Sequence, residues 1–244
     1  MKKAITVMLL MLCSLCLLPS AMAAVDLTAP LEGAVYYPDG ASFEDAKYVF
    51  SYRLPQVHTS AVAGEGINAY YQILQEEMLF FTAPIQAEIS TETQSEVQMY
   101  TRIDYQVTLS SDDYFSVITS TEQFMGAAST QMIRGQVFSL HGAFPGQVVT
   151  LPTMLSFDDD TAATRVIDTV YDLVWEVIEE QLDSGEFYEG LTQEDMFAEF
   201  YPEEDFYLDE SGNIVFFIQP GMISIEAAGL LSFPFAPEEI LSAM

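Results

Sequence analysis

Alternating apolar and polar positions predict strands along much of the chain. The clearest case is residues 102–109, where every second residue is apolar and the residues between are polar, so one face of the strand meets water. A polar turn at residues 110–113 and a second β-rich run at 114–124 complete a predicted hairpin. The other predicted strands are residues 47–54, 131–140, 147–151, 206–208, 214–218 and 230–235.

Two longer segments have the apolar spacing of amphipathic helices. Residues 67–81 carry apolar side chains at helical spacing, and Pro84 is expected to end this helix. Residues 162–182 place valine, leucine and isoleucine on one side and acidic residues on the other. Aspartates 158–160 stand at the start of this second helix, where one of them can cap it, and Gly185 is expected to stop it.

A shorter helix is indicated by Thr192 and Asp195, which have the spacing of a capping box, and Pro202 closes this segment. Strands therefore come as paired runs with helices between them, and the spacing indicates no regular βαβ alternation. The predicted class is α+β, with antiparallel sheets and hairpins packed against two main helices. The pattern places a division into two halves near residue 130.

The first 23 residues have the three parts of a secretory signal peptide. Two lysines form a positively charged start, residues 4–18 are an apolar run, and a small-x-small pattern predicts cleavage between Ala23 and Ala24. The apolar run is shorter than the roughly 20 residues of a spanning helix, which argues against the alternative of an uncleaved anchor. Cleavage would remove both cysteines, so the remaining chain could form no disulfide. We therefore expect an exported protein, periplasmic or extracellular, with no membrane anchor after cleavage.

Acidic residues greatly outnumber basic ones. The sequence holds 37 acidic residues against 7 lysines and arginines, a formal net charge of −30, while 50% of its residues are hydrophobic. The apolar content favours a folded protein over a disordered one. The charge would repel nucleic acid and anionic lipid, whose binding depends on basic contacts, and would attract a basic protein. The alternative is that the acidic excess only keeps an exported protein soluble and monomeric.

Residue types that carry most enzyme chemistry are scarce. His58 and His141 are the only histidines, and their neighbours offer no metal-ligand spacing, so each is expected on the surface or in a loop. The sequence has no Gly-x-Ser-x-Gly motif and no glycine-rich phosphate loop. The acidic clusters at residues 158–160 and 203–205 resemble solvated turn or cap residues and lack the spacing of a calcium loop. We predict no catalytic residue, no metal site and no cofactor, with calcium at these clusters as the alternative.

Several segments resemble one bacterial extracytoplasmic domain family. They include the hairpin at residues 206–220, the segment around residue 229 before the last strand, and a central segment at residues 124–129 that is similar to an aromatic-x-Gly-Gly-Ala-His pattern. This family forms the C-terminal half of RsiV, a lysozyme-sensing anti-sigma factor, and accompanies the N-terminal module of PdaC-type proteins. The motif residues singled out by the resemblance are Phe124, Gly126, Ala128, Ser129, Gln219, Pro220 and Gly229.

After the predicted signal peptide at residues 1–23, the resemblance implies two parts: a PdaC-like α+β module at 24–130 and an RsiV-like domain at 131–244. Ser129 stands where the family usually has histidine, so a role that needs that side chain does not transfer. Charge and the lysozyme-binding relative together favour an exported, non-catalytic binding protein that engages a basic protein such as lysozyme or a cell-wall component. The alternatives are a carboxylate-dependent cell-wall hydrolase or modifying enzyme, and a structural accessory protein of the envelope.

Overall fold

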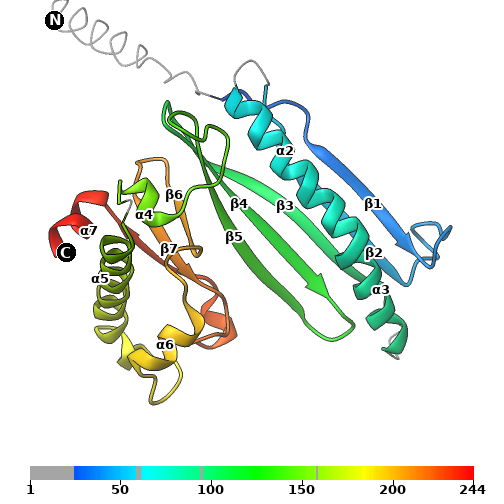
Figure 1. Ribbon diagram of the computed structural model, residues 1–244. Helices are drawn as coiled ribbons and strands as arrows, with labels where there is room; N and C mark the ends of the chain where they lie inside the picture. Colours follow the sequence, from blue (N-terminus) through cyan, green and yellow to red (C-terminus); the bar gives the residue numbers. More distant parts are fainter. Residues whose placement is uncertain (1–24, 59–61, 94–95, 158) are drawn as a thin grey trace, which may run out of the picture.

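Two β-sheets and a set of helices make up the described part of the chain (Figure 1). The computed structural model describes residues 25–58, 62–93, 96–157 and 159–244, so the predicted cleavage site at Ala23 and Ala24 lies outside it, as does Asp158. The five-stranded sheet has the order β1-β2-β3-β4-β5, and the three-stranded sheet the order β6-β7-β8. The predicted α+β class is confirmed.

The elements have the following bounds. The strands are β1 (Leu31–Tyr37), β2 (Tyr48–Leu54), β3 (Met99–Ser110), β4 (Tyr114–Phe124), β5 (Ser129–Ser139), β6 (Phe206–Leu208), β7 (Ile214–Ile218) and β8 (Leu231–Phe235). The helices are α2 (Val62–Glu77), the π-helical turn η1 (Met78–Thr82), α3 (Ala83–Glu92), α4 (Leu151–Met154), α5 (Asp160–Glu179), η2 (Leu182–Ser184), α6 (Gln193–Glu199), η3 (Glu226–Ala228) and α7 (Pro237–Ala243). All predicted strands except the one at 147–151 correspond to β2–β8, within a few residues.

One pair of strands departs from the predicted antiparallel arrangement. β2 and β3 are parallel neighbours, with Tyr48 opposite Met99 and Tyr52 opposite Ile103. The other neighbours in both sheets pair antiparallel. Parallel strands need a long crossover, which α2 and α3 supply between β2 and β3. The chain therefore contains one βαβ unit that the spacing of apolar residues did not reveal.

The prediction that Pro84 ends the first helix is wrong. The helix continues from α2 through η1 into α3, and Pro84 lies in the first turn of α3. Proline is tolerated in the first turn of a helix because the N–H that it lacks would have no intrahelical acceptor there. The π-helical turn η1 changes the hydrogen-bond spacing just before Pro84. Within it the Ala83 N–H donates to the carbonyl of Met78, five residues back.

Residues 147–151 do not form the predicted strand. Val148 makes only an isolated bridge with Phe138, and the chain then turns into the single helical turn α4. Pro152 lies in that turn and could not have donated to a sheet ladder. Sequence reasoning also missed β1 and α7, although Pro237 followed by two glutamates is typical of a helix start.

The second main helix is confirmed as α5. Its buried side chains recur every four residues and are Val166, Val170, Val174 and Ile178. The helix is capped by the Asp159 carboxylate, which accepts a hydrogen bond from the Ala162 N–H at 2.9 Å. The helix ends at Glu179, and the short turn η2 follows before Gly185. No helix in the described part of the chain is long and apolar enough to cross a membrane.

One face of the larger sheet is covered by the continuous helix formed by α2, η1 and α3. The three-stranded sheet packs on the opposite face. Buried α2 residues pack with β2, β3, β4 and β5 in one apolar cluster, while Val137 of β5 belongs to a second cluster with α5 and β6–β8. The Leu208 N–H of β6 donates to the buried Ser116 hydroxyl of β4 at 2.9 Å. At Gly135, a side chain would overlap the backbone carbonyl of Phe206, so glycine permits this close approach. The predicted boundary at residue 130 falls inside β5, which pairs with β4 along its length.

Candidate functional site

Acidic side chains are concentrated in the last third of the chain. Residues 166–244 contain 19 acidic residues and no lysine or arginine. They include most of α5, all of α6 and the three-stranded sheet. Because no cation within this segment offsets the carboxylates, its surface presents a potential of one sign.

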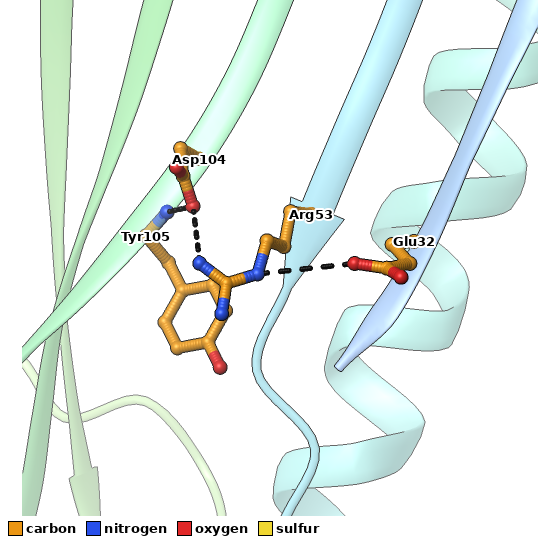
Figure 2. A network of polar contacts seen from close by, with 4 residues as sticks. All are labelled: Glu32, Arg53, Asp104 and Tyr105. Atoms are coloured by element: carbon orange, nitrogen blue, oxygen red, sulfur yellow. Dashed lines mark hydrogen bonds and ion pairs between the residues drawn. The ribbon is translucent and has the colours of Figure 1, made fainter. Parts of the chain in front are cut away.

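An ion-pair network on the larger sheet holds one of the few basic side chains (Figure 2). The Arg53 guanidinium lies 3.4 Å from an Asp104 oxygen and 3.9 Å from a Glu32 oxygen, with its carbon 5.3 Å from the centre of the Tyr105 ring. The same Asp104 oxygen accepts the Tyr105 main-chain N–H at 2.8 Å. The network joins β1, β2 and β3, and its partners are half exposed, so its contribution to stability is small.

A second arginine is neutralised in the same way. Arg102 on β3 lies 3.4 Å from a Glu122 oxygen on the neighbouring strand β4. Arg53 and Arg102 therefore pair with carboxylates of the larger sheet, and none of their described ion-pair partners belongs to residues 166–244.

An acidic hollow of about 350 Å³ lies beside α6. Three carboxylates, those of Glu189, Asp195 and Glu199, stand on its wall with the aromatic ring of Tyr188. The rest of its lining is Gly190, Leu191, Ala198, Met222 and Ile223. A second hollow of about 430 Å³ shares the 188–191 loop and adds Asp183. Carboxylates and an aromatic ring together suit a cationic side chain, which both attract.

Main-chain pairing brings the distant segments of the acidic hollow together. The Tyr188 N–H donates to the Ile223 carbonyl at 3.2 Å, and the Ile225 N–H donates to the Glu186 carbonyl at 2.8 Å. The Tyr188 hydroxyl donates to the Gly221 carbonyl at 2.9 Å, which holds the ring against the hollow. Sequence reasoning missed this site because residues 188–199 and 222–223 are more than 20 positions apart and carry no binding or catalytic motif.

The predicted capping box positions one of the three carboxylates. The Asp195 carboxylate accepts the Thr192 hydroxyl at 2.6 Å and the Thr192 N–H at 2.9 Å, and the Asp195 N–H donates to the Thr192 hydroxyl at 3.3 Å. Hydrogen bonds from the hydroxyl and then from the main chain of Thr192 lower the pKa of Asp195. Its negative charge is therefore retained at mildly acidic pH.

Asp205 differs from its acidic neighbours Glu203 and Glu204. Those two are exposed, as expected of solvated turn residues, whereas Asp205 is half-buried. The pKa of Asp205 is raised to about 6, chiefly by burial and further by the charges of Glu204 and Glu203. The Tyr201 N–H, which donates to the Asp205 carboxylate at 2.9 Å, lowers the pKa and offsets part of this rise. The cluster at 203–205 therefore contains one carboxyl that titrates near neutral pH.

Replacing Asp205 by asparagine is expected to remove part of the pH dependence of stability. Because the folded-state pKa is raised, this group contributes most to the free energy of unfolding below its unfolded pKa, and the contribution is lost as the pH rises through about 6. After allowance for its partial exposure, the loss between pH 4 and pH 7 is about 1 kcal/mol. Urea unfolding of Asp205→Asn at both pH values should show a smaller decrease than the wild type. Glu179→Gln, at an exposed site, is the control for the general effect of charge, and an equal change in both variants would contradict the prediction.

Four of the seven motif residues lie at the turn between β4 and β5. Phe124 pairs with Ser129 across the hairpin, and its ring stacks on Tyr100 with centroids 5.8 Å apart. Gly126 has a φ of 95°, which favours glycine, and Ala128 lies beside it in the turn. These residues shape the hairpin.

Of the other three motif residues, Gln219 makes a contact between the two sheets. The Gln219 side-chain amide donates to the Ile133 carbonyl at 2.7 Å and accepts the Ile133 N–H at 3.0 Å. Pro220 follows it, and Gly229 ends η3 with a φ of 74°. None of the seven motif residues lines the acidic hollow.

The two histidines lie apart from the acidic hollow. His58 and His141 are both exposed, as predicted, and neither lines either acidic cavity. Within the described ranges, no group of three or more histidine, cysteine, aspartate or glutamate side chains is placed to hold a metal ion.

The arrangement of a five-stranded and a three-stranded sheet with flanking helices is shared with solved bacterial structures. A DUF3298 family member from Bacteroides fragilis matches 91% of this chain and 94% of its own, with a TM-score of 0.55 and 15% sequence identity. A DUF3298 family protein from Pseudomonas aeruginosa matches 90% of this chain and 93% of its own, with a TM-score of 0.50 and 11% identity. DUF3298 is a bacterial domain of unknown function. No protein-family model and no curated protein matches the sequence.

Proposed function

We propose that this chain is an exported, non-catalytic binding protein that engages a basic protein, such as lysozyme, through its acidic C-terminal part. The observation that carries the proposal is the absence of lysine and arginine from residues 166–244, which hold 19 acidic residues. The predicted signal peptide supports export. The fold shared with DUF3298 proteins is compatible with the resemblance to the RsiV ectodomain.

The acidic hollow supplies the contact that bulk charge alone would lack. A lysine or arginine side chain of the partner would enter between Glu189 and Glu199 and lie against the Tyr188 ring. Its capping hydrogen bonds lower the pKa of Asp195, so this charge persists to lower pH than that of an ordinary aspartate. Long-range attraction would raise the association rate, and the hollow would slow dissociation.

The test compares lysozyme binding by two variants of equal net charge. Glu189→Gln with Glu199→Gln removes two charges from the acidic hollow, while Glu44→Gln with Glu96→Gln removes two exposed charges outside it. Calorimetric titration at 20 mM and 150 mM salt should give a Kd raised about tenfold or more for the hollow variant. The remote variant should lose affinity mainly through the general field, about twofold.

Asp195 is left unchanged in this test because its carboxylate also caps α6. Equal losses in the two variants would show that only net charge matters and would remove the acidic hollow from the proposal. Undetectable lysozyme binding at 20 mM salt, where screening is weak, would overturn the proposed partner itself.

A further inference from the structure

The long helix that covers the larger sheet exposes a row of large apolar side chains. Phe80 and Phe81 are 74% and 58% exposed, and their rings touch edge to face with centroids 4.8 Å apart. We call this row the apolar stripe: it consists of Ile73, Phe80, Phe81, Ile85 and Ile89, all exposed. A soluble surface seldom gathers apolar side chains in this way without an interaction to serve.

The π-helical turn η1 allows two consecutive phenylalanines, Phe80 and Phe81, to be exposed within the apolar stripe. Met78 and Ala83, at the two ends of η1, are buried against the sheet, and they are five residues apart instead of the usual three or four. The extra residue lets both Phe80 and Phe81 lie on the outward side. Irregular helical turns of this kind are frequent at functional sites.

Charges on the same helix indicate the sign of the partner. Between Arg53 and Arg102 the chain has no lysine or arginine. Exposed carboxylates flank Phe80 and Phe81 in two groups, Glu76 with Glu77 on one side and Glu88 with Glu92 on the other. A second copy of this chain, with its net charge of −30, and an anionic bilayer would both be repelled. A cationic partner with an apolar face would satisfy both features.

We propose that the apolar stripe docks a cationic amphipathic helix. The apolar face of such a helix would cover Phe80, Phe81 and the isoleucines, and its lysines or arginines would reach the flanking glutamates. Between α3 and the Tyr37-Pro38 segment lies a hollow of about 500 Å³, where Pro84 and Ala87 offer a further apolar contact beside the charged side chains of Lys47 and Glu88. The helices α2 and α3 lie on one side of the larger sheet and α6 on the other (Figure 1). The apolar stripe and the acidic hollow beside α6 are therefore separate surfaces, and the two binding proposals can fail independently.

The test uses an 18-residue leucine-lysine peptide whose leucines fall on one helical face. Calorimetric titration of the purified protein at 150 mM salt should show binding, with Kd raised about tenfold or more by Phe80→Ser combined with Phe81→Ser. Phe43→Ser combined with Phe144→Ser is the matched control, because both side chains are exposed and lie outside the apolar stripe. The peptide Kd of this control should lie within about twofold of the wild-type value. The same is expected of the acidic-hollow variant, Glu189→Gln with Glu199→Gln.

Three results would overturn the proposal. One is an unchanged peptide Kd in the Phe80 and Phe81 variant. Another is light scattering that shows self-association lost in that variant, since the occupant would then be a second copy. The third is binding of the wild type, and not of that variant, to phosphatidylcholine vesicles, which would make the surface a lipid contact. A lysine-only peptide of equal charge should bind the wild type and the variant alike, because it has no apolar face.

Discussion

Replacing Gly135 by alanine is expected to lower the free energy of unfolding by about 3 kcal/mol. The new methyl group would overlap the Phe206 carbonyl oxygen, and backbone on both sides of the contact leaves no flexible side chain to move away. The three-stranded sheet would have to shift from the face of β5. Urea unfolding should show the loss, and the melting temperature should fall by about 6–12 °C.

Trp175, the only tryptophan, makes the same variant informative about the two halves of the chain. It lies on α5, within the cluster that includes β6–β8, so its fluorescence reports on the C-terminal part. In Gly135→Ala the fluorescence transition should precede the loss of far-UV circular dichroism, because the contact between the sheets is weakened first. Gly142→Ala is the control: no atom lies within 4 Å of the added methyl group, and only its φ of 82° costs energy. An equal loss in both variants would show that close packing at Gly135 is unimportant.

Replacing Phe216 by alanine is expected to cost about 4 kcal/mol, the largest effect of a single side chain in the C-terminal part. Phe216 is fully buried on the central strand β7, and its ring lies 6.0 Å from that of Phe200, 6.3 Å from that of Phe206 and 6.2 Å from that of Phe235. The three neighbours cannot all close onto the cavity, so both transfer energy and packing are lost.

The matched control for Phe216→Ala is Phe197→Ala, in the same part of the protein. Phe197 is 41% exposed and its ring contacts Tyr171 at 4.4 Å, so its removal should cost no more than about 1.5 kcal/mol. Denaturant midpoints of the two variants check the difference. Similar midpoints would mean that β7 is not the centre of the C-terminal core.

Local patterns predicted the hairpins and the second helix because the signals are local. The alternation in β3, the valine stripe of α5 and the Thr192–Asp195 capping box each arise from residues a few positions apart. The parallel β2–β3 pair and the passage of the helix through Pro84 could not be found in this way. They depend on the crossover packing and on a π-turn, neither of which has a sequence period of its own.

Only the sign of the charge at the candidate site could be predicted from the sequence. The sequence is strongly anionic, and this is the basis for predicting a cationic partner. The acidic hollow needs residues 188–199 and 222–223, which main-chain pairing around Tyr188 and Ile223 brings together. The motif residues lie instead in the β4–β5 turn and around Gln219, where they shape the hairpin and bond to Ile133 of β5.

The Gln219 amide also affects how molecules of this protein meet. β5 is one of the two edge strands of the larger sheet, and an edge strand with free N–H and carbonyl groups is a template for intermolecular pairing. Gln219 occupies both groups of Ile133 midway along β5, much as a residue of a sixth strand would. Gln219, with the main-chain bonds that residues 147 and 149 make to β5, thus interrupts one edge at which copies could polymerise. This should protect against aggregation even where salt screens electrostatic repulsion.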